Sequence, residues 1–555
     1  MTWLLHISRV TTFDYDYIIV GSGFGGSVSA LRLREKGYRV AVLEAGRRFK
    51  DEEYAESAWD LKRFLWAPSL GMRGITRLSP FKDIFIASGA AVGGGSTVYA
   101  NTLYRAKPEF FDNPQWAELE DWATALAPHF DTAERMLGVA RVPYPSAGQE
   151  LLKKVGAHFG VEDTFTRTPV AIYFGEPGRT VPDPYFGGEG PERTGCTRCG
   201  ACMVGCRVGA KNTLLKNYLW FAEKAGAEVF ADTEVAEIRP LGAADGSDGY
   251  RVTTQRPGAW IAKGRRTLTA RGIVVSAGAL GTNKLLAKCK VTGALPRLSE
   301  RLGDLVRTNS ESILAVTLPD DSTKPWFDVA ISASVHPRPD THIELCTYGR
   351  KGDFMMLLLA PLTGNGTRLT RPLMLLASIL KSPLRFLRSR IPVGWSRRSL
   401  IVLVMQTSDN AIAFRPVRKL FGGIGLRTEQ HSEKPNPTFI PIANEAAEYL
   451  AELTGGFAQS GILEAAANIP TTAHILGGAP IGKDAKHGVV DHRLRAFGYE
   501  NFLICDGSAM PANPGVNPSL TITALAEYAM THIPAAHPHA HTHAMAASTS
   551  KTVSA

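Results

Sequence analysis

The feature that most constrains this chain of 555 residues is a glycine-rich turn between a short apolar strand and a helix near the N-terminus. Residues 15–20 (YDYIIV) predict a β-strand, which is followed by Gly21, Gly23 and Gly26 and then by a helical pattern, SVSALRLREKG. A second predicted strand, RVAVL, ends at an acidic residue, Glu44. This order of strand, glycine turn, helix, strand and acid is typical of a βαβ unit that binds a dinucleotide.

Each glycine has its own physical role in such a turn. Gly21 permits the tight turn, Gly23 lets a pyrophosphate approach the backbone, and Gly26 lets the helix pack closely on the strand. The pyrophosphate would lie at the helix N-terminus, where free N–H groups and the helix dipole favour an anion. Glu44 stands where an acid accepts hydrogen bonds from the ribose hydroxyls. The turn alone does not separate FAD from NAD.

Composition places the chain among ordinary folded proteins, since 44% of the residues are hydrophobic and 21% are charged. A chain of this length has enough material for more than one core. The N-terminus lacks the basic stretch and long apolar run of a secretory signal peptide. No apolar run reaches the roughly 18 residues that a membrane span needs. We therefore expect a cytoplasmic protein.

Four of the seven cysteines fall within one short segment, residues 195–214. An odd total with four cysteines bunched together argues against a secreted disulfide framework. The four follow the C-x2-C-x2-C-x3-C spacing of a ferredoxin, although Arg207 stands where a proline is usual. An iron–sulfur cluster and a zinc ion are two alternatives for such a set of thiols, and plain thiols or a redox-labile disulfide are the others. The four residues are Cys196, Cys199, Cys202 and Cys206.

The net charge of +10 is unevenly distributed. Segment 354–408 contains no Asp or Glu, and its arginines and lysines alternate with leucines and with Trp395. This pattern is typical of a segment that lies on an anionic bilayer as a peripheral contact. A solvated basic face over a covering helix is the alternative. Because no nucleic-acid-binding module accompanies the charge, nucleic acid is not an expected partner.

Further motifs follow in a fixed order along the chain. They are GGGSTVYAN (93–101), a strand and helix around AGALGTNKLL, TAHILGGAPIG (472–482), FLICDGSAMP (502–511) and GVNPSLTITALAE (515–527). In this order the motifs resemble those of the glucose–methanol–choline (GMC) family of FAD-dependent alcohol oxidoreductases. Three other stretches, GSGFGGSVSALRLREKGYRVAVLEAGRRF, TVPDPYFGGEGPERTGC and RTNSESI, are similar to its cholesterol-oxidase-like branch.

The resemblance implies an α/β (α+β) fold in which discontinuous segments build an FAD-binding Rossmann-like βαβ domain. A substrate domain on a mostly antiparallel sheet would accompany it. The implied boundaries are 14–308 and 441–534 for the two parts of the FAD-binding domain and 309–440 for the substrate domain. The histidine-rich tail, 535–555, is of low complexity, and we expect it to be disordered.

The resemblance also implies contacts with the cofactor. The adenosine end of FAD would lie against Gly21, Gly23, Gly26 and Glu44, with a backbone contact from Val235 to adenine. The isoalloxazine would lie near Gly94, Gly95, Asn101, Asp506 and Asn517.

The implied catalytic residues are His474 and Asn517. Oxidation of an alcohol by hydride transfer needs a base or hydrogen-bond acceptor that holds the hydroxyl oxygen near the flavin. Taken alone, His474 could equally be a core histidine and Asn517 a turn residue before Pro518. A third residue, Glu344, with Glu311 as its rival, would move a proton between ring carbons of the product.

The function implied is oxidation of the 3β-hydroxyl of cholesterol or a related sterol to the ketone, followed by isomerisation of the double bond. The electron acceptor would be O2 or a carrier protein. The alternative is an FAD-dependent lipid-alcohol or sugar dehydrogenase that passes electrons through an iron–sulfur cluster to a carrier. A flavoprotein without alcohol chemistry is the non-enzymatic alternative.

Overall fold

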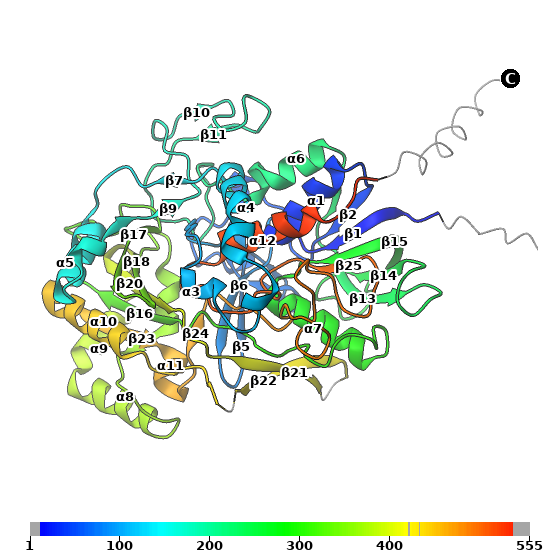
Figure 1. The fold of residues 1–555 in the computed structure, drawn as a ribbon. Coiled ribbons are helices and arrows are strands. Elements are labelled where there is room, and N and C mark those ends of the chain that lie inside the picture. Colours follow the sequence, from blue (N-terminus) through cyan, green and yellow to red (C-terminus); the bar gives the residue numbers. More distant parts are fainter. Residues whose placement is uncertain (1–11, 420–421, 432, 537–555) are drawn as a thin grey trace, which may run out of the picture.

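The N-terminal βαβ unit forms as the sequence predicts. The computed structural model describes residues 12–419, 422–431 and 433–536. Strand β1 (Tyr15–Val20) leads through the glycine turn into helix α1 (Phe24–Glu35), and β2 (Val40–Leu43) follows. Strand β1 pairs in parallel with β2 and with β15 (Arg266–Val275). The turn after β1 therefore opens at the carboxyl edge of a parallel sheet (Figure 1), where nucleotides bind in such folds.

The first sheet has the strand order β12–β2–β1–β15–β14–β13, and β25 pairs with β15. Its remaining strands are β12 (Glu228–Phe230), β13 (Glu234–Pro240), β14 (Tyr250–Gln255) and β25 (Phe502–Ile504). Strands β12 and β25 pair in parallel with their neighbours, whereas β13 and β14 are antiparallel. Because the strands come from both ends and the middle of the chain, this part of the fold is discontinuous in sequence, as predicted.

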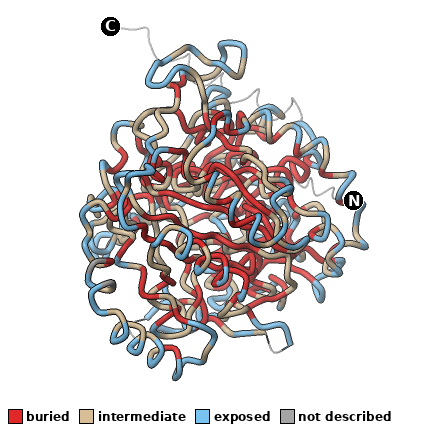
Figure 2. Tube along the Cα trace, turned by 90° about the vertical axis from the view of Figure 1, so that its left-hand side faces the viewer, coloured by how far each residue is buried: buried red, intermediate tan, exposed pale blue. Residues whose placement is uncertain are grey.

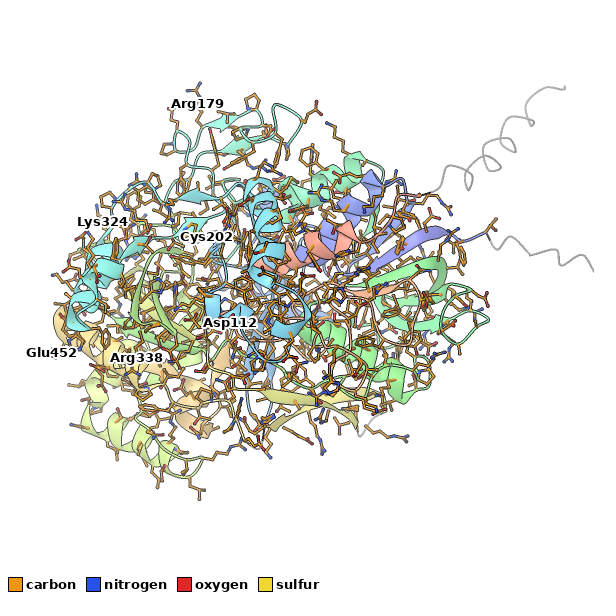
Figure 3. All side chains as sticks on the ribbon, viewed as in Figure 1. Asp112, Arg179, Cys202, Lys324, Arg338 and Glu452 are labelled. Atoms are coloured by element: carbon orange, nitrogen blue, oxygen red, sulfur yellow. The ribbon has the colours of Figure 1, made fainter. Side chains whose placement is uncertain are left out.

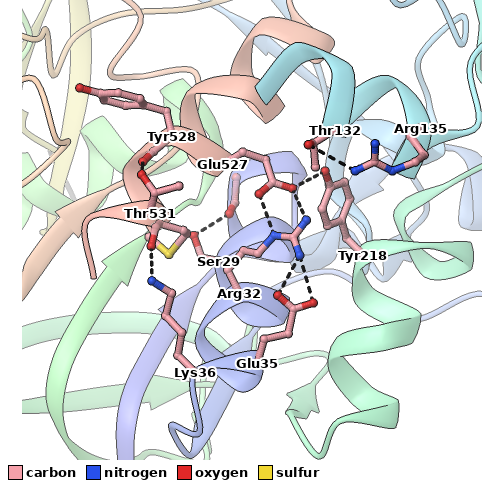
Figure 4. A network of polar contacts seen from close by, with 12 residues as sticks. Ser29, Arg32, Glu35, Lys36, Thr132, Arg135, Tyr218, Glu527, Tyr528 and Thr531 are labelled. Atoms are coloured by element: carbon pink, nitrogen blue, oxygen red, sulfur yellow. Dashed lines mark hydrogen bonds and ion pairs between the residues drawn. The ribbon is translucent and has the colours of Figure 1, made fainter. Parts of the chain in front are cut away.

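Helices on one side of this sheet are joined by buried polar contacts. Helix α1 packs against α6 (Tyr218–Lys224) and α12 (Ser519–Thr531), and α12 also packs against α4 (Trp122–Leu137). The guanidinium of Arg32 donates two hydrogen bonds of 2.7 Å to the carboxylate of Glu527, and the Tyr218 hydroxyl donates a third of 2.6 Å (Figure 4). These contacts fix α12, which begins two residues after Asn517, on the nucleotide unit.

The second sheet is antiparallel throughout, with the strand order β19–β23–β16–β20–β18–β17–β8. Its strands are β8 (Thr166–Arg167), β16 (Ser312–Thr317), β17 (Ile331–Arg338), β18 (Thr341–Cys346), β19 (Leu359–Pro361), β20 (Ser399–Gln406) and β23 (Phe457–Gly461). Helices α5 (Ala147–His158) and α10 (Pro441–Thr454) cover one face. The predicted antiparallel sheet is confirmed, and β8 and β23 join it from outside 309–440. The domain boundaries themselves stay a prediction.

Smaller elements surround the two sheets, and the buried part of the chain runs through the centre of the molecule (Figure 2). Helix α8 (Thr370–Lys381) and helix α9 (Pro383–Ser389) project at the lower left of Figure 1, beside α11 (Ile462–Ala467). The other helices are α2 (Leu61–Phe64), α3 (Pro108–Phe111) and α7 (Gly278–Val291). The other strands are β3 (Trp66–Ala67), β4 (Met72–Arg73), β5 (Thr76–Pro80), β6 (Phe85–Gly89), β7 (Ala140–Arg141), β9 (Pro169–Val170), β10 (Thr180–Val181), β11 (Arg193–Thr194), β21 (Ile412–Arg418), β22 (Ile424–Gln430) and β24 (Thr471–Thr472).

Within the described ranges, no helix has the length and apolar character needed to cross a bilayer. Residues 537–555, which make up most of the predicted tail, lie outside the described residues.

Candidate active site

A cavity of about 1440 Å³ is lined by residues of both sheets and of the two glycine turns. Many of the residues predicted to bind the cofactor or to act in catalysis meet in this cavity although they are far apart in sequence. They are Gly21, Gly23, Glu44, Gly94, Gly95, Val235, His474, Asp506 and Asn517. Gly26 is buried beneath the turn, where a Cβ atom would lie 2.1 Å from the Gly21 carbonyl oxygen. Its role is therefore close packing, as the motif predicts.

The carboxylate of Glu44 stabilises the first glycine turn through hydrogen bonds. Its Oε2 atom accepts hydrogen bonds from the backbone N–H (3.0 Å) and the hydroxyl (2.8 Å) of Ser22, and its Oε1 atom accepts one of 2.7 Å from the Gly46 N–H. The Ser22 hydroxyl in turn accepts from the N–H of Gly93 (3.0 Å), at the start of the second glycine turn. The two turns are also in close contact, since a Cβ on Gly94 would lie 2.6 Å from the Gly23 Cα.

The residues of the cavity fit an FAD molecule. Helix α1 begins at Phe24 with no side chain capping its free N–H groups, and Gly23 faces open space. Such an uncapped N-terminus beside a glycine can hold a pyrophosphate. The amide of Asn101 is buried and makes no hydrogen bond to the described residues, so it has donor and acceptor capacity to offer a bound group. Asn101 itself does not line the cavity, but its neighbours Ala100 and Thr102 do.

The Asp506 carboxylate has its own partners. It accepts hydrogen bonds from the Gly278 N–H (2.9 Å) and the Thr282 hydroxyl (2.5 Å) at the start of α7, and two more from Ser508. Burial raises the pKa of Asp506, although these donors oppose the shift. The Asp506 side chain therefore holds the start of α7 at the cavity wall through hydrogen bonds. The contact of Asp506 with the isoalloxazine stays a prediction.

His474 lies against a buried carboxylate. Its Nδ1 atom is 3.2 Å from Oε1 of Glu311, and 15% of the His474 side chain is exposed. The other carboxylate oxygen of Glu311 accepts hydrogen bonds from the Thr472 hydroxyl (2.7 Å) and the Ala473 N–H (2.8 Å). Glu311 is therefore held by the segment that carries His474, which fixes the orientation of the imidazole.

Glu344 lies behind Asn517. The Asn517 amide Nδ2 donates to Oε2 of Glu344 at 3.3 Å, while the Asn517 Oδ1 atom has no partner among the described residues. The Glu344 side chain is fully buried. Both sequence candidates for the third residue thus lie in the same cluster: Glu311 contacts His474, and Glu344 contacts Asn517.

Burial and neighbouring charges shift the pKa values of this cluster. Burial raises the pKa of Glu344 to about 8, against the opposing effects of the Asn517 hydrogen bond and the charge of His474. For His474, burial disfavours the imidazolium, but the carboxylates of Glu311 and Glu344 raise its pKa above the ordinary value. The cluster thus contains a strengthened base next to a carboxyl group that keeps its proton at neutral pH.

Sequence reasoning missed His342, which also belongs to the cluster. Its Nε2 atom lies 3.0 Å from Oε1 of Glu344, and its side chain is fully buried. Its position in the sequence could have identified it, because His342 is two residues from Glu344 and residues two apart on a strand share a face.

The part of the cavity nearest to the second sheet is apolar. Its lining side chains there are Ile313, Ile331, Met355, Leu358, Leu359, Trp395, Ile401 and Leu403. Such a surface suits a bulky apolar molecule better than a sugar, whose hydroxyls would lose their hydrogen bonds to water.

The metal site predicted for the four clustered cysteines is not supported by the described residues. Cys202, which is labelled in Figure 3, is buried, Cys199 is exposed, Cys196 and Cys206 are half-buried, and all four are free. They line a hollow of only about 20 Å³. In the described part of the chain, no three His, Cys, Asp or Glu side chains are arranged to hold a metal ion.

Burial favours the neutral form of two of these cysteines. It raises the pKa of Cys202 to about 12 and that of Cys196 well above its usual range, and the neighbouring thiols add to both shifts. The nearby arginines are engaged elsewhere, because Arg198 stacks on Tyr144 and Arg207 donates to backbone carbonyls. A bound metal ion would itself favour the thiolate form of its ligands, so these pKa values do not decide the question. The metal site predicted at these residues is not supported by the structure.

A dinucleotide cavity that also holds a histidine and a buried carboxyl group defines the class of protein as an oxidoreductase with a nucleotide cofactor. Models of two GMC oxidoreductase domains match residues 191–304 and 429–526, and an NAD(P)-binding Rossmann-like domain matches residues 19–50.

Relatives and solved structures agree with this class. The chain is 49% identical to a cholesterol oxidase of Mycobacterium tuberculosis (strain ATCC 25618 / H37Rv), over 93% of this chain and 90% of that protein. It is 45% identical to a cholesterol oxidase of Acinetobacter baumannii, over 95% and 96% respectively. A pyridoxine 4-oxidase from Mesorbium loti shares the fold with a TM-score of 0.60 at 16% identity, over 93% of this chain and 99% of that one. The chain belongs to the GMC oxidoreductase family and is an FAD-dependent alcohol oxidoreductase.

Proposed function

We propose that this enzyme oxidises the 3β-hydroxyl group of cholesterol or a related sterol to the ketone. The observation that carries the proposal is the meeting of His474, Asn517 and Glu344 beside an apolar cavity wall. Two relatives that are 45–49% identical are cholesterol oxidases, which supports the same substrate class.

FAD bound in the cavity would accept the hydride from the carbinol carbon. The chain itself provides the base: with Nδ1 facing Glu311, the Nε2 atom of His474 is left to accept the hydroxyl proton. Asn517 lines the cavity and orients Glu344, which is buried behind it. The apolar side chains of the second sheet bind the ring system and exclude water.

Glu344 is the proposed isomerisation residue. A carboxyl group that loses and regains a proton can transfer it between two ring carbons, which brings the double bond into conjugation with the new ketone. Because its pKa is raised to about 8, Glu344 holds a proton that a neighbouring base can exchange at physiological pH.

Oxygen is the proposed electron acceptor. Among the described residues, no group of side chains is arranged to hold a metal ion, which gives an iron–sulfur relay to a partner protein no support. The sugar or lipid-alcohol dehydrogenase with an iron–sulfur relay is therefore the less supported alternative. We also propose a cytoplasmic location, which the seven free cysteines support.

Contact with a bilayer is the last part of the proposal. We define the α8–α9 surface as the exposed side chains Leu369, Leu373, Leu376, Leu380, Leu384 and Leu387. Helix α8 is anchored to α11 by a buried ion pair of 3.2 Å between Arg371 and Glu464, and Ile462 and Leu463 of α11 line the cavity. An apolar stripe next to basic residues, with no acid in the segment, suits an anionic membrane from which a sterol is taken.

The test is turnover by the FAD-loaded enzyme with cholesterol in air. Oxygen uptake, hydrogen peroxide and a conjugated ketone are expected together. Oxidation without conjugation would remove the isomerase role, and turnover of sugars in preference to sterols would contradict the substrate class.

A further inference from the structure

One face of the second sheet carries a row of polar side chains next to the catalytic cluster. On β18, His342 and Glu344 point to the same face because they are two residues apart. Their cross-strand neighbour β17 pairs Ser334 with Glu344 in antiparallel register, so His336 on the same strand lies beside His342. The two imidazole rings are in edge contact, with centroids 4.7 Å apart.

His342 has one polar partner, which is the carboxyl group of Glu344. Its Nε2 atom lies 3.0 Å from Oε1, and its Nδ1 atom is buried without a hydrogen-bond partner in the described residues. The Tyr104 ring packs on it edge-on at 4.9 Å, while the Tyr104 hydroxyl bonds to Ser334 at 2.7 Å. The surroundings therefore fix the ring and leave its hydrogen bonding to Glu344 alone.

The two partners of Glu344 differ in what they can do. The Asn517 Nδ2 group can only donate a hydrogen bond, which favours the carboxylate. A neutral imidazole can either donate from Nε2 or accept at it, depending on the tautomer. Burial lowers the pKa of His342 to about 3, so the ring is neutral and keeps both options. His342 can therefore keep its hydrogen bond whether Glu344 holds a proton or has lost it.

We propose that His342 is a positioning residue that holds the carboxyl group of Glu344 in one orientation through both of its protonation states. This inference rests on the proposed function, because Glu344 is the group that it positions. The titratable groups that face the pair from the surrounding elements are His336, Tyr104, Lys107, His474, Glu311 and Cys346.

The test compares four variants of the FAD-loaded enzyme. His342→Phe removes the hydrogen bond to Glu344. His342→Asn introduces an amide on a side chain that is too short to reach the Glu344 carboxyl group, whereas His342→Gln places an amide at about the distance of the original Nε2 atom. His336→Phe is the matched control, since it replaces the neighbouring ring that makes no bond to Glu344. Loss of one hydrogen bond to a reacting group corresponds to roughly a tenfold lower kcat in the Phe and Asn variants. The Gln variant and the His336 control should stay within about threefold of the parent.

A spectroscopic titration separates positioning from general damage. The carboxylic acid C=O stretch of Glu344, assigned with Glu344→Gln, is followed by infrared difference spectroscopy from pH 5 to pH 10. The hydrogen bond from His342 to the ionised carboxylate is stronger than the bond to the neutral acid, so its loss should raise the titration midpoint by about one pKa unit in His342→Phe and His342→Asn. The midpoint should return to the parent value in His342→Gln and should equal the parent value in His336→Phe.

Equal midpoints and equal kcat in the parent, His342→Asn and His342→Phe would overturn the inference. Because the resting enzyme is titrated without substrate, the comparison of midpoints is independent of whether cholesterol is the substrate. If the parent fails to oxidise sterols while the midpoint still shifts in His342→Phe and His342→Asn, the proposed function alone would be contradicted.

Discussion

The amide of Asn517 lies 3.3 Å from the carboxylate of Glu344, and this contact joins two residues that are 173 positions apart. One residue precedes α12 beside the nucleotide-binding sheet, and the other lies in the middle of the antiparallel sheet. The catalytic cluster therefore forms only where the two sheets meet. Any change that separates the sheets should remove activity before it unfolds either of them.

Replacing Glu344 by Gln should change how stability depends on pH. Since its folded-state pKa is raised from 4.5 to about 8, the folded protein binds this proton more tightly than the unfolded chain. The stabilisation is complete below pH 4.5 and is lost as the pH rises through 8. Between pH 4.5 and pH 9 the parent should lose about 3–5 kcal/mol of unfolding free energy relative to Glu344→Gln. Denaturant titrations at both pH values measure the difference, and a Glu452→Gln surface variant, which should follow the parent, is the control.

Removing the carboxylate of Glu527 should destabilise the protein strongly. Glu527→Ala leaves the Arg32 guanidinium without its buried partner, at a cost of about 3–5 kcal/mol. Glu35 binds the same guanidinium at the surface, and its side chain is 47% exposed, so Glu35→Ala should cost less than about 1 kcal/mol. Thermal melts of the two variants test this contrast, and equal shifts would show that the buried pair has no special role.

Charged substitutions on the α8–α9 surface should weaken binding to lipid. Leu373→Glu combined with Leu380→Glu places two carboxylates on an apolar, basic stripe, so binding to vesicles with anionic lipid should fall by at least about tenfold. Leu70→Glu is the matched control, because Leu70 is 72% exposed but lies elsewhere on the surface. Co-sedimentation with vesicles gives the bound fraction. Unchanged binding in the double variant would show that this surface only faces solvent.

The cysteine segment should bind no stoichiometric metal. Protein purified without oxygen should contain much less than one iron or zinc per chain, and its visible spectrum should show flavin bands alone. Serine at Cys199 or Cys206 should leave that spectrum and turnover with oxygen unchanged, since both thiols are free. Broad additional absorption that is lost in these variants would restore the iron–sulfur alternative.

The nucleotide-binding part could be predicted because its determinants are local. Gly21 and Gly23 follow one strand directly and Glu44 ends the next, so a short stretch of sequence contains the whole βαβ unit. The antiparallel character of the second sheet was implied by the family resemblance and not by its strands, of which β18 and β20 are buried along nearly their whole length. The full set of strands in this sheet could not be predicted, because β8 and β23 come from distant parts of the chain.

The candidate site was predictable only where motifs mark it. His474 and Asn517 stand in recognisable motifs, whereas His342 is identified only by its contact with Glu344. The cysteine spacing alone does not decide between a metal site and free thiols. Regular spacing places thiols along the chain, but a metal site also requires that their sulfur atoms converge, and the described residues contain no group of side chains arranged to hold a metal ion.

The most direct test of the account is anaerobic reduction of the FAD-loaded enzyme by cholesterol, followed by stopped-flow absorption. The parent should lose its oxidised flavin absorption with one equivalent of sterol, while His474→Ala should keep bound FAD and be reduced about 10²–10⁴ times more slowly. Reduction of His474→Ala at the parent's rate would contradict the assignment of the base, and a parent that cholesterol does not reduce would contradict the proposed function.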